Sequence, residues 1–399
     1  MMYRMHLLMG LALVCVVALG CRSKGEPVRT PAAGVRVATF NIEDMKASEL
    51  LDRRTPRLKA CARILQRIDA DIVVINEIPY DPEFDLARRF AEDFVNLAGR
   101  AGNPATIYRG YAWPSNTGVH TGIDLDRNGV IDPEVGSRDY GGDSRGYGTY
   151  PGQYAMAILV RAGLDLKINE VRTFRNILWK DVPGADLPID PQSGDSWYSD
   201  SALSMLPLSS KSHWDVPVEL PSGHIVHMLV SHPTPPSFDG EEDRNGKRNY
   251  DEIRFWRQYI DGEDWIVDDQ GRRGGLGSDA LFVIAGDLNA DPDEGSGKSG
   301  AIQQLLRHPR VEGRFVPKSN TLSSGLDADD TADFDLRVDY VLPSRGIGIR
   351  AGAVWRSPVD DPEARITSGE LSPFGQPMGS FPSDHYPVWI DLVLPSRRK

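Results

Sequence analysis

The sequence contains few cysteines: three among 399 residues, at Cys15, Cys21 and Cys61. Cys15 lies within, and Cys21 directly after, an apolar N-terminal segment that we expect to be processed. The mature chain then keeps Cys61 as its free thiol, so a fold stapled by intramolecular disulfides is excluded. Cys61 falls on the apolar face of an expected helix, and we predict that it is buried as a small hydrophobic residue.

Long apolar runs are also scarce. One run, Leu7–Leu19, stands out and follows Arg4 and His6. As a helix it would span about 20 Å, which is too short for a bilayer core of ~30 Å. We therefore interpret residues 1–20 as a signal peptide rather than a membrane span.

The apolar run ends in Ala18-Leu19-Gly20-Cys21, which resembles a bacterial lipobox, although Ala18 and Leu19 depart from its usual residues. This pattern predicts a lipid on Cys21, with residues 21–33 as a flexible tether. We then expect an exported, membrane-anchored lipoprotein in the periplasm or at the cell surface. An ordinary signal peptide followed by a chance cysteine is the alternative.

Basic residues are outnumbered, since 45 Lys and Arg stand against 57 Asp and Glu, for a formal charge of −12. An acidic protein is repelled by bulk DNA, so tight structural binding of nucleic acid is not expected. Transient turnover of a phosphate substrate at a metal site is not excluded. Apolar residues make up 40% of the chain, which is enough for a sizeable core and excludes general disorder.

Short apolar runs alternate with helical patterns and polar loops from Val35 onward, so one α/β domain over residues 34–395 is the simplest organisation. Several runs are apolar at consecutive positions, as expected of strands covered on both faces. Long loops rich in Gly, Asp and Ser are expected at 101–152 and 181–213. The expected strands are Val35–Ile42, Asp71–Asn76, Gln153–Val160, His224–Ser231, Ala280–Ala285, Arg337–Leu342 and Val388–Leu394, and the expected helices are Pro56–Ile68, Phe84–Leu97, Asn249–Ile260 and Gly300–Arg307.

Polar residues end five of the apolar segments, and strand ends are common places for functional sites. Together they offer oxygen ligands, two imidazoles and amide donors, which are the components of a metal-assisted hydrolase. The segments are Thr39-Phe40-Asn41, Ile75-Asn76-Glu77, Val230-Ser231-His232, Ala285-Gly286-Asp287-Leu288-Asn289 and Ser383-Asp384-His385.

The order of these segments resembles the endonuclease/exonuclease/phosphatase superfamily over nearly the whole chain after the signal. That superfamily includes DNase I-like nucleases, abasic-site endonucleases, inositol phosphatases and bacterial sphingomyelinases. Its most specific motifs match Gly286-Asp287-Leu288-Asn289 and Ser383-Asp384-His385. The resemblance implies a DNase I-like α/β fold, a four-layer sandwich of two packed mixed β-sheets flanked by helices.

The resemblance also implies a metal site. Glu77 corresponds to the main ligand of Mg²⁺ or Mn²⁺, with Asn41 beside it and Asp384 facing the metal. A hard cation held by one or two carboxylates that keeps several waters suits Mg²⁺ or Mn²⁺. Asn76 precedes Glu77 where many relatives have Gln, and we expect little consequence because the carboxylate is the ligand.

Catalytic roles follow for five further residues. The resemblance implies that His385 contacts the scissile phosphate or activates water, and that Asp339 orients His385 and fixes its tautomer. Asp287 would position or deprotonate the attacking water, and Asn289 would donate to a phosphoryl oxygen. His232 occupies the place of a residue that assists the leaving oxygen.

Three further patterns leave their interpretation open. Asp124, Asp126, Asn128 and Asp132 alternate like the first positions of a calcium loop, but Val135 stands where the bidentate Glu belongs. A structural Ca²⁺ site and an unliganded turn are both possible. A shorter pattern of the same kind spans residues 243–246. Residues 209–214 combine hydroxyls, an ammonium and an aromatic that suit either contact with a phosphate or a base, or plain loop packing.

The expected function is a divalent-metal-dependent phosphoester hydrolase, in first place a phosphodiesterase or nuclease, because of His232 and the Ser383-Asp384-His385 motif. The alternatives are an extracytoplasmic, phytase-like phosphomonoesterase and a non-catalytic surface-binding lipoprotein. The expected partners are a phosphate-ester substrate, either nucleic acid or a small diester or monoester, and the membrane through Cys21. The sequence gives no reason to infer a protein partner.

Overall fold

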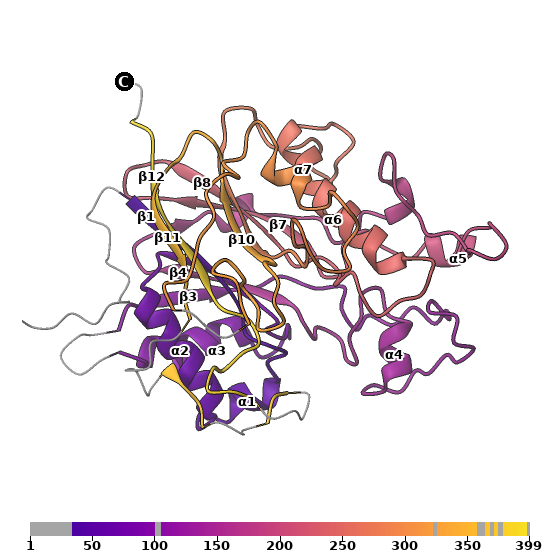
Figure 1. Cartoon of the computed structure of the whole chain (residues 1–399), viewed down its shortest axis with the longest axis horizontal. Coiled ribbons are helices and arrows are strands. Elements are labelled where there is room, and N and C mark those ends of the chain that lie inside the picture. Colours follow the sequence, from indigo (N-terminus) through magenta and orange to yellow (C-terminus); the bar gives the residue numbers. More distant parts are fainter. Residues whose placement is uncertain are drawn as a thin grey trace, which may run out of the picture.

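Two β-sheets form the centre of the protein in a computed structural model, which describes residues 34–99, 105–321, 325–356, 364–367, 371–373 and 378–396 (Figure 1). The expected signal peptide and lipidated tether, residues 1–33, lie outside the described residues. Among the residues that are described, no helix is both long and apolar enough to cross a membrane.

The first sheet has six strands in the order β11-β12-β1-β2-β4-β3. Strands β1 and β2 run parallel, and the other neighbours pair antiparallel. The sheet is therefore mixed, as predicted. Its strands are β1 (Gly34–Asn41), β2 (Ile72–Asn76), β3 (Tyr108–Tyr111), β4 (Met156–Arg161), β11 (Gly348–Val354) and β12 (Val388–Val393).

The second sheet also has six strands, in the order β10-β9-β8-β7-β5 with β6 paired to β7. Here β8 and β9 are the parallel pair, and the other pairs are antiparallel. The strands are β5 (Asp165–Leu166), β6 (Arg172–Thr173), β7 (His213–Glu219), β8 (Ile225–Ser231), β9 (Leu281–Asp287) and β10 (Asp339–Pro343).

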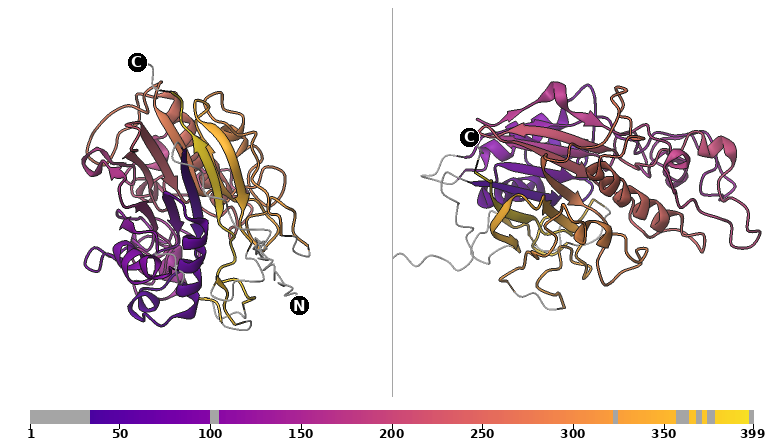
Figure 2. Two further views of the ribbon diagram at one scale, coloured as in Figure 1. Left: turned by 90° about the vertical axis from the view of Figure 1, so that its left-hand side faces the viewer. Right: turned by 90° about the horizontal axis from the view of Figure 1, so that it is seen from above.

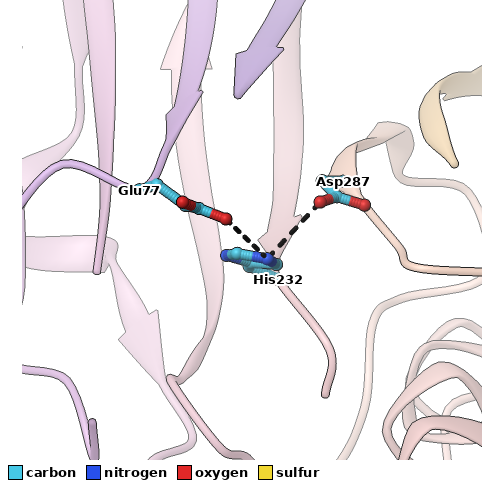
Figure 3. Close-up of side chains that lie close together, drawn as sticks. All are labelled: Glu77, His232 and Asp287. Carbon is cyan, nitrogen blue, oxygen red and sulfur yellow. Dashed lines mark ion pairs between the residues drawn. The ribbon is translucent and has the colours of Figure 1, made fainter. Parts of the chain in front are cut away.

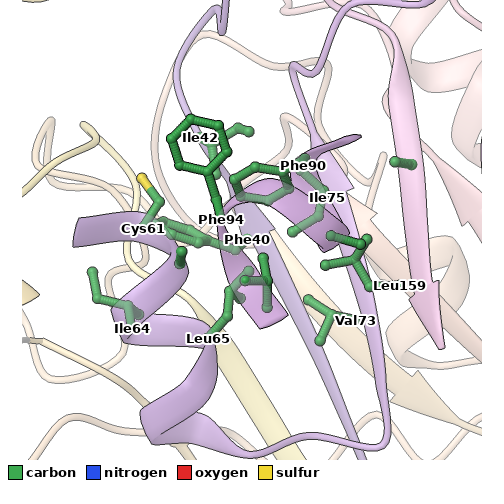
Figure 4. Close-up of a cluster of buried hydrophobic side chains, with 14 of the residues drawn as sticks. Phe40, Ile42, Cys61, Ile64, Leu65, Val73, Ile75, Phe90, Phe94 and Leu159 are labelled. Carbon is green, nitrogen blue, oxygen red and sulfur yellow. The ribbon is translucent and has the colours of Figure 1, made fainter. Parts of the chain in front are cut away.

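Consecutive apolar residues in β1 and β2 serve two different cores because side chains alternate across a strand. Val37 and Val74 face the space between the sheets, where they pack with Val216 and Val283 of the second sheet. Their neighbours on the opposite face, such as Phe40, pack against helices instead. Figure 4 shows this outer cluster, in which Phe40, Cys61 and Phe90 lie together. The predicted burial of Cys61 is confirmed.

Helices cover the outer face of each sheet, on either side of the paired sheets (Figures 1 and 2). Helices α2 (Pro56–Ile68) and α3 (Leu86–Asp93) pack on the first sheet, and α6 (Arg244–Asp261) packs on the second. The predicted fold class of two packed mixed sheets flanked by helices is confirmed. The short helices are α1 (Ala47–Leu51), η1 (Val95–Leu97), α4 (Arg138–Gly142), η2 (Ile168–Glu170), η3 (Trp179–Asp181), α5 (Asp200–Leu203) and α7 (Gln303–Leu306).

The expected elements are all present, but several boundaries were wrong. The helix expected over Phe84–Leu97 breaks into α3 and η1, and the one over Gly300–Arg307 shrinks to α7. Helix α6 begins five residues before its expected start, because residues 243–246 form its N-terminus rather than a loop. The interpretation of residues 243–246 as a short calcium loop is therefore wrong.

Five strands were not expected from the sequence: β3, β5, β6, β7 and β11. Strand β7 contains Pro217 and Asp215, residue types that are rare in strands, and β11 contains two glycines. The segment expected to be a loop at 101–152 holds β3 and α4, and the one at 181–213 holds α5, the last residue of η3 and the first residue of β7. Figure 1 shows α4 and α5 beyond the ends of the strands.

Candidate metal and catalytic site

The site forms where strand ends of the two sheets meet. Asn41 ends β1 and Glu77 follows β2, while His232 follows β8 and Asp287 ends β9. Because β1 and β2 are parallel, and β8 and β9 are parallel, each pair delivers its polar residues to one edge of its sheet. Packing of the sheets then brings the two edges together.

Glu77, His232 and Asp287 form one compact group (Figure 3). His232 Nε2 lies 3.4 Å from Asp287 Oδ2 and 3.9 Å from Glu77 Oε1. One ligand atom from each of the three residues falls within 4.8 Å of the others, a spacing that could hold a metal ion. His232 and Asp287 are buried, whereas Glu77 is partly exposed.

Asn41 connects the two carboxylates of this group. Its Nδ2 donates to Glu77 Oε1 and to Asp287 Oδ2, at 3.0 Å each. Its Oδ1 accepts from the Glu43 amide at 3.0 Å. In this orientation Asn41 presents nitrogen to the acidic group, so its predicted metal ligation would require the amide to turn over.

Glu77 is held in an unusual backbone conformation just after β2. Its φ is 66°, in the left-handed region that side chains with a Cβ seldom occupy. The Glu77 amide donates to the Ala155 carbonyl at 2.9 Å, and Glu77 Oε2 accepts from the Asp44 amide at 2.6 Å. These bonds fix both the turn and the direction of the carboxylate.

Asp339 and His385 form a second group with Asp287. Asp339 lies directly opposite Asp287 in the β9–β10 pairing. His385 Nδ1 donates to Asp339 Oδ2 at 2.8 Å, and His385 Nε2 lies 3.9 Å from Asp287 Oδ2. Burial disfavours an imidazolium, but Asp339, Asp384 and Asp287 outweigh it and raise the pKa of His385 well above its ordinary value.

Asp287 is an ionised carboxylate with two imidazoles and Asn289 around it. Burial alone would raise its pKa, but His385 and His232 outweigh burial and lower the pKa of Asp287 below its ordinary value. Its Oδ1 accepts from the Asn289 amide at 2.9 Å. The Asn289 side chain donates from Nδ2 to the Pro233 carbonyl at 3.1 Å, which holds its carboxamide beside Asp287.

Asp384 lies at the edge of the site with 36% of its side chain exposed, and its Oδ1 is 3.9 Å from His385 Nε2. It belongs to neither three-residue group. Burial raises the pKa of Asp384 to about 6, opposed by His385 and assisted by Glu77. Burial, together with Asp384 and Glu77, likewise raises the pKa of Glu43 to about 8. This accumulation of carboxylates favours a bound cation.

Two residues of the site received no specific role in it from the sequence. Asn76 accepts the Asp287 amide on Oδ1 at 3.1 Å and donates from Nδ2 to the Ser231 carbonyl at 3.4 Å. It therefore connects the first sheet to both parallel strands of the second. An amide inside an otherwise apolar strand next to Glu77 was the available signal.

Lys211 is the second site residue without a specific role assigned from the sequence. Lys211 is 6% exposed, and its ammonium donates to the Pro233 carbonyl at 3.3 Å, the same oxygen that accepts from Asn289. Burial lowers the pKa of Lys211, while Glu252, Glu77 and Asp287 oppose this shift. Lys211 is the part of the 209–214 run that lies at the site.

The remaining residues of that run pack in the interior. Ser210 donates from its amide and its hydroxyl to Glu252 Oε1, at 2.6 and 2.9 Å. Trp214 is fully buried between the sheets. These residues therefore pack in the interior, Ser209, Ser210 and Ser212 in the loop and His213 and Trp214 in strand β7.

The calcium-like motif lies apart from both groups. Asp124 and Asp126 come together with Asp143, which the sequence pattern did not include. Asn128 Oδ1 accepts from the Val130 amide at 2.7 Å, and Asp132 Oδ1 accepts from the Glu134 amide at 2.9 Å. Neither Asn128 nor Asp132 is one of the three acids of the group, although the Asn128 backbone amide donates to Asp124 Oδ1 at 3.1 Å and to Asp126 Oδ1 at 3.2 Å.

Comparison with known proteins identifies the family. The model of the endonuclease/exonuclease/phosphatase family matches residues 38–385. No curated protein matches the sequence significantly.

Similar solved structures include an endonuclease/exonuclease/phosphatase from Beutenbergia cavernae, at 17% identity and TM-score 0.47, covering 91% of this chain and 72% of that one. The human Nocturnin catalytic domain is 14% identical with TM-score 0.47, covering 90% and 93%. Bacteroides thetaiotaomicron mannosyl-6-phosphatase is 14% identical with TM-score 0.43, covering 90% and 100%. On the strength of the family match, this chain belongs to the endonuclease/exonuclease/phosphatase family and is a hydrolase of phosphoester bonds.

Proposed function

We propose that this hydrolase is a divalent-metal-dependent phosphodiesterase or nuclease. The observation that carries the proposal is the pair of imidazoles on one carboxylate: His232 Nε2 and His385 Nε2 lie 3.4 and 3.9 Å from Asp287 Oδ2. Cleavage of a diester expels an alkoxide, which is a poor leaving group unless it receives a proton. Two imidazoles allow one to act on the phosphate and the other to protonate the leaving oxygen.

The charge of the site also favours a diester. A monoester carries about −1.5 to −2 charges near pH 7, whereas a diester carries one. The carboxylates of Glu77, Asp287 and Asp384 crowd the site, and Lys211 is a buried ammonium beside them. A substrate with less negative charge is repelled less by these carboxylates.

Each residue then has a task in hydrolysis. Asp287 positions the attacking water and takes its proton as the new bond to phosphorus forms. His232 gives a proton to the departing oxygen as the ester bond breaks. His385, held by Asp339, contacts a phosphoryl oxygen, and the Asn289 amide donates to another as negative charge increases.

The donor set fits a hard divalent cation. Glu77 and Asp287 supply carboxylate oxygens within 4.8 Å of each other, and carboxylates are preferred ligands of Mg²⁺ and Mn²⁺. We propose that Glu77 holds the cation, with Asp384 and, after an amide turn, Asn41. When bound, the cation would neutralise charge on the phosphoryl group.

The place of action is a further part of the proposal. The lipobox-like Ala18-Leu19-Gly20-Cys21 segment supports an exported lipoprotein anchored through Cys21. The substrate would then be a phosphodiester that this enzyme meets outside the cytoplasm.

A substrate panel tests the proposal. The purified full chain is assayed with Mg²⁺, Mn²⁺ or Ca²⁺ on bis-p-nitrophenyl phosphate, p-nitrophenyl phosphate and plasmid DNA, with Glu77→Gln as the control for contaminating enzymes. We expect the diester or DNA to be cleaved with the higher kcat/KM. A preference for the monoester would instead support the phytase-like phosphomonoesterase.

A further inference from the structure

Three carboxylates lie together away from the catalytic site. Asp124 and Asp126 belong to the segment between β3 and β4, and Asp143 is the C-cap residue of α4. One oxygen from each falls within 4.8 Å of the others. The fold therefore adds a third acid, from a distant position in the segment, to the two acids of the sequence motif.

The burial and hydrogen bonding of Asp143 point to a ligand at this group. Its side chain is 0% exposed. Its Oδ1 accepts from the Leu125 amide at 2.7 Å, but its Oδ2 has no hydrogen-bond partner among the described residues. A buried carboxylate oxygen without a partner destabilises the fold through its lost hydration. A cation bound to this oxygen would offset that loss.

Basic side chains nearby do not neutralise the group. Arg127, which lies within the motif, is directed elsewhere: it pairs with Asp190 at 2.8 Å and lies over the Trp197 ring at 4.3 Å. His120 acts electrostatically on Asp143, but its Nδ1 accepts from the Gly122 amide at 3.1 Å and its Nε2 makes no hydrogen bond. The three carboxylates are left without an ion-pair partner among the described side chains.

Gly142 lets Asp126 come close to the end of α4. A Cβ at this position would lie 2.4 Å from Asp126 Oδ2, nearer than real contacts allow. The glycine before Asp143 thus permits the approach that completes the group.

We propose that Asp124, Asp126 and Asp143 bind a structural Ca²⁺ ion. Ca²⁺ accepts several carboxylates and carbonyls in flexible geometry, whereas Mg²⁺ usually keeps its waters and binds one or two carboxylates. An oxygen-only group with three carboxylates therefore suits Ca²⁺ better. The site differs from the linear calcium loop of the sequence motif, because Asp143 replaces Asp132.

Ca²⁺ at this place would join distant parts of the β3–β4 segment. The Thr121 amide donates to the Asp143 carbonyl at 2.9 Å, and the Asn116 amide donates to the Lys211 carbonyl at 2.8 Å. The segment that carries the site thus also contacts the backbone of a residue beside the catalytic group. Binding would stabilise the protein and hold this segment in place.

Thermal unfolding of the full chain tests the proposal. After removal of metal with EDTA and exchange into chelator-free buffer, Tm is measured against CaCl2 concentration. We expect Tm to rise by several degrees, with a dissociation constant on the order of 10⁻⁵ to 10⁻³ M. Because the catalytic group could also bind Ca²⁺, the titration is repeated with Glu77→Gln, which should keep the rise.

Two neighbouring acids provide the matched comparison. Asp143→Asn preserves the acceptor for Leu125 and should lose the rise, whereas Asp132→Asn, outside the group, should keep it. Asp126→Asn, which should also lose the rise, decides the matter if Asp143→Asn does not fold. The proposal is overturned if Ca²⁺ leaves the wild-type Tm unchanged, if Asp126→Asn or a folded Asp143→Asn keeps the full rise, or if Glu77→Gln abolishes it.

Discussion

His385 shows how a single hydrogen bond can define a catalytic group. Its Nδ1 donates to Asp339 Oδ2 at 2.8 Å, which fixes the orientation of the ring and directs Nε2 toward Asp287. Asp339 is fully buried, and its Oδ1 has no hydrogen-bond partner among the described residues. The carboxylate therefore serves the imidazole rather than the substrate.

Removal of this imidazole should slow the reaction strongly. Loss of one positioned hydrogen-bond donor to a phosphoryl oxygen typically lowers kcat about 10²- to 10³-fold, and we expect a decrease of that order for His385→Ala, with the fold retained. Asp339→Asn should lower kcat less, because the imidazole remains. The double variant should show less than the sum of both losses, since the two residues serve one function.

The measurements are kcat and Tm for the wild type, both single variants and the double variant. A folded His385→Ala protein with near-normal turnover would contradict the proposed mechanism. Additive losses would leave the enzyme assignment intact but would refute the link between His385 and Asp339.

Asn76 supports Asp287 from the opposite sheet. Asn76→Ala removes the buried acceptor of the Asp287 amide, so we expect a loss of about 1–3 kcal/mol in unfolding free energy together with a lower kcat. Denaturant titration and steady-state kinetics measure both. Asn96→Ala is the control, because Asn96 bonds to Tyr108 away from the site and should lower stability alone. An unchanged kcat in Asn76→Ala would show that Asn76 does not position Asp287.

The sequence predicted those residues of the candidate site that lie at the ends of strands. Glu77, His232 and Asp287 each end or directly follow an apolar run, and parallel pairing brings such strand ends to the same edge of a sheet. Lys211 and Asp143 could not be found this way, because their importance depends on burial and on contacts with distant segments. Sequence spacing does not report either property.

At the scale of elements, hydrophobic pattern predicted the strands that are covered on both faces. Strands β1 and β2 are apolar at consecutive positions because each face enters a different core. Strand β7 is just as buried, yet it carries His213, Asp215 and Pro217, whose polar groups are satisfied by specific partners. Pattern alone cannot reveal such partners.

His213 in β7 gives the protein a pH-dependent stability. Its Nε2 donates to the Glu252 carbonyl and its Nδ1 accepts from Ser209, so the folded protein holds it neutral. Burial lowers the pKa of His213 from 6.5 to about 4. The unfolded chain therefore binds the proton first, and stability falls as pH drops from about 6.5 to 4, by on the order of 3 kcal/mol in total.

Guanidinium unfolding at several pH values between 7 and 4 measures this loss. His213→Gln should show a shallower decline, by about 1.4 kcal/mol per pH unit in the middle of the window. Comparison of slopes cancels other titrating groups and any constant cost of the substitution. Equal slopes in both proteins would refute the assignment to His213.

At the scale of the molecule, the layered arrangement came from the family resemblance rather than from the pattern of each element. Periodicity indicates that β8 and β9 are strands, but it does not say that they pair in the second sheet. The order in which strands join depends on packing across the whole chain. The resemblance supplied the two-sheet arrangement without the strand order, and the two mixed sheets agree with that arrangement.

Location in the cell is a property of the whole molecule as well. If Cys21 carries the lipid, Cys21→Ser should release the protein from membranes into the soluble extracytoplasmic fraction. Fractionation followed by immunoblotting compares the variant with the wild type after a salt wash. Persistent membrane association of Cys21→Ser would refute the lipid anchor at this residue.

Dependence on a divalent cation is the most direct test of whether this protein is a metal-dependent phosphodiesterase. The rate of bis-p-nitrophenyl phosphate hydrolysis is measured before metal removal, in excess EDTA, and after Mg²⁺ or Mn²⁺ is added back. Because Glu77 and Asp287 are themselves negative, they cannot neutralise charge on the phosphoryl group without a cation. We expect activity to disappear in EDTA and to return with metal; undiminished hydrolysis by the metal-free protein would contradict the proposed metal-dependent mechanism.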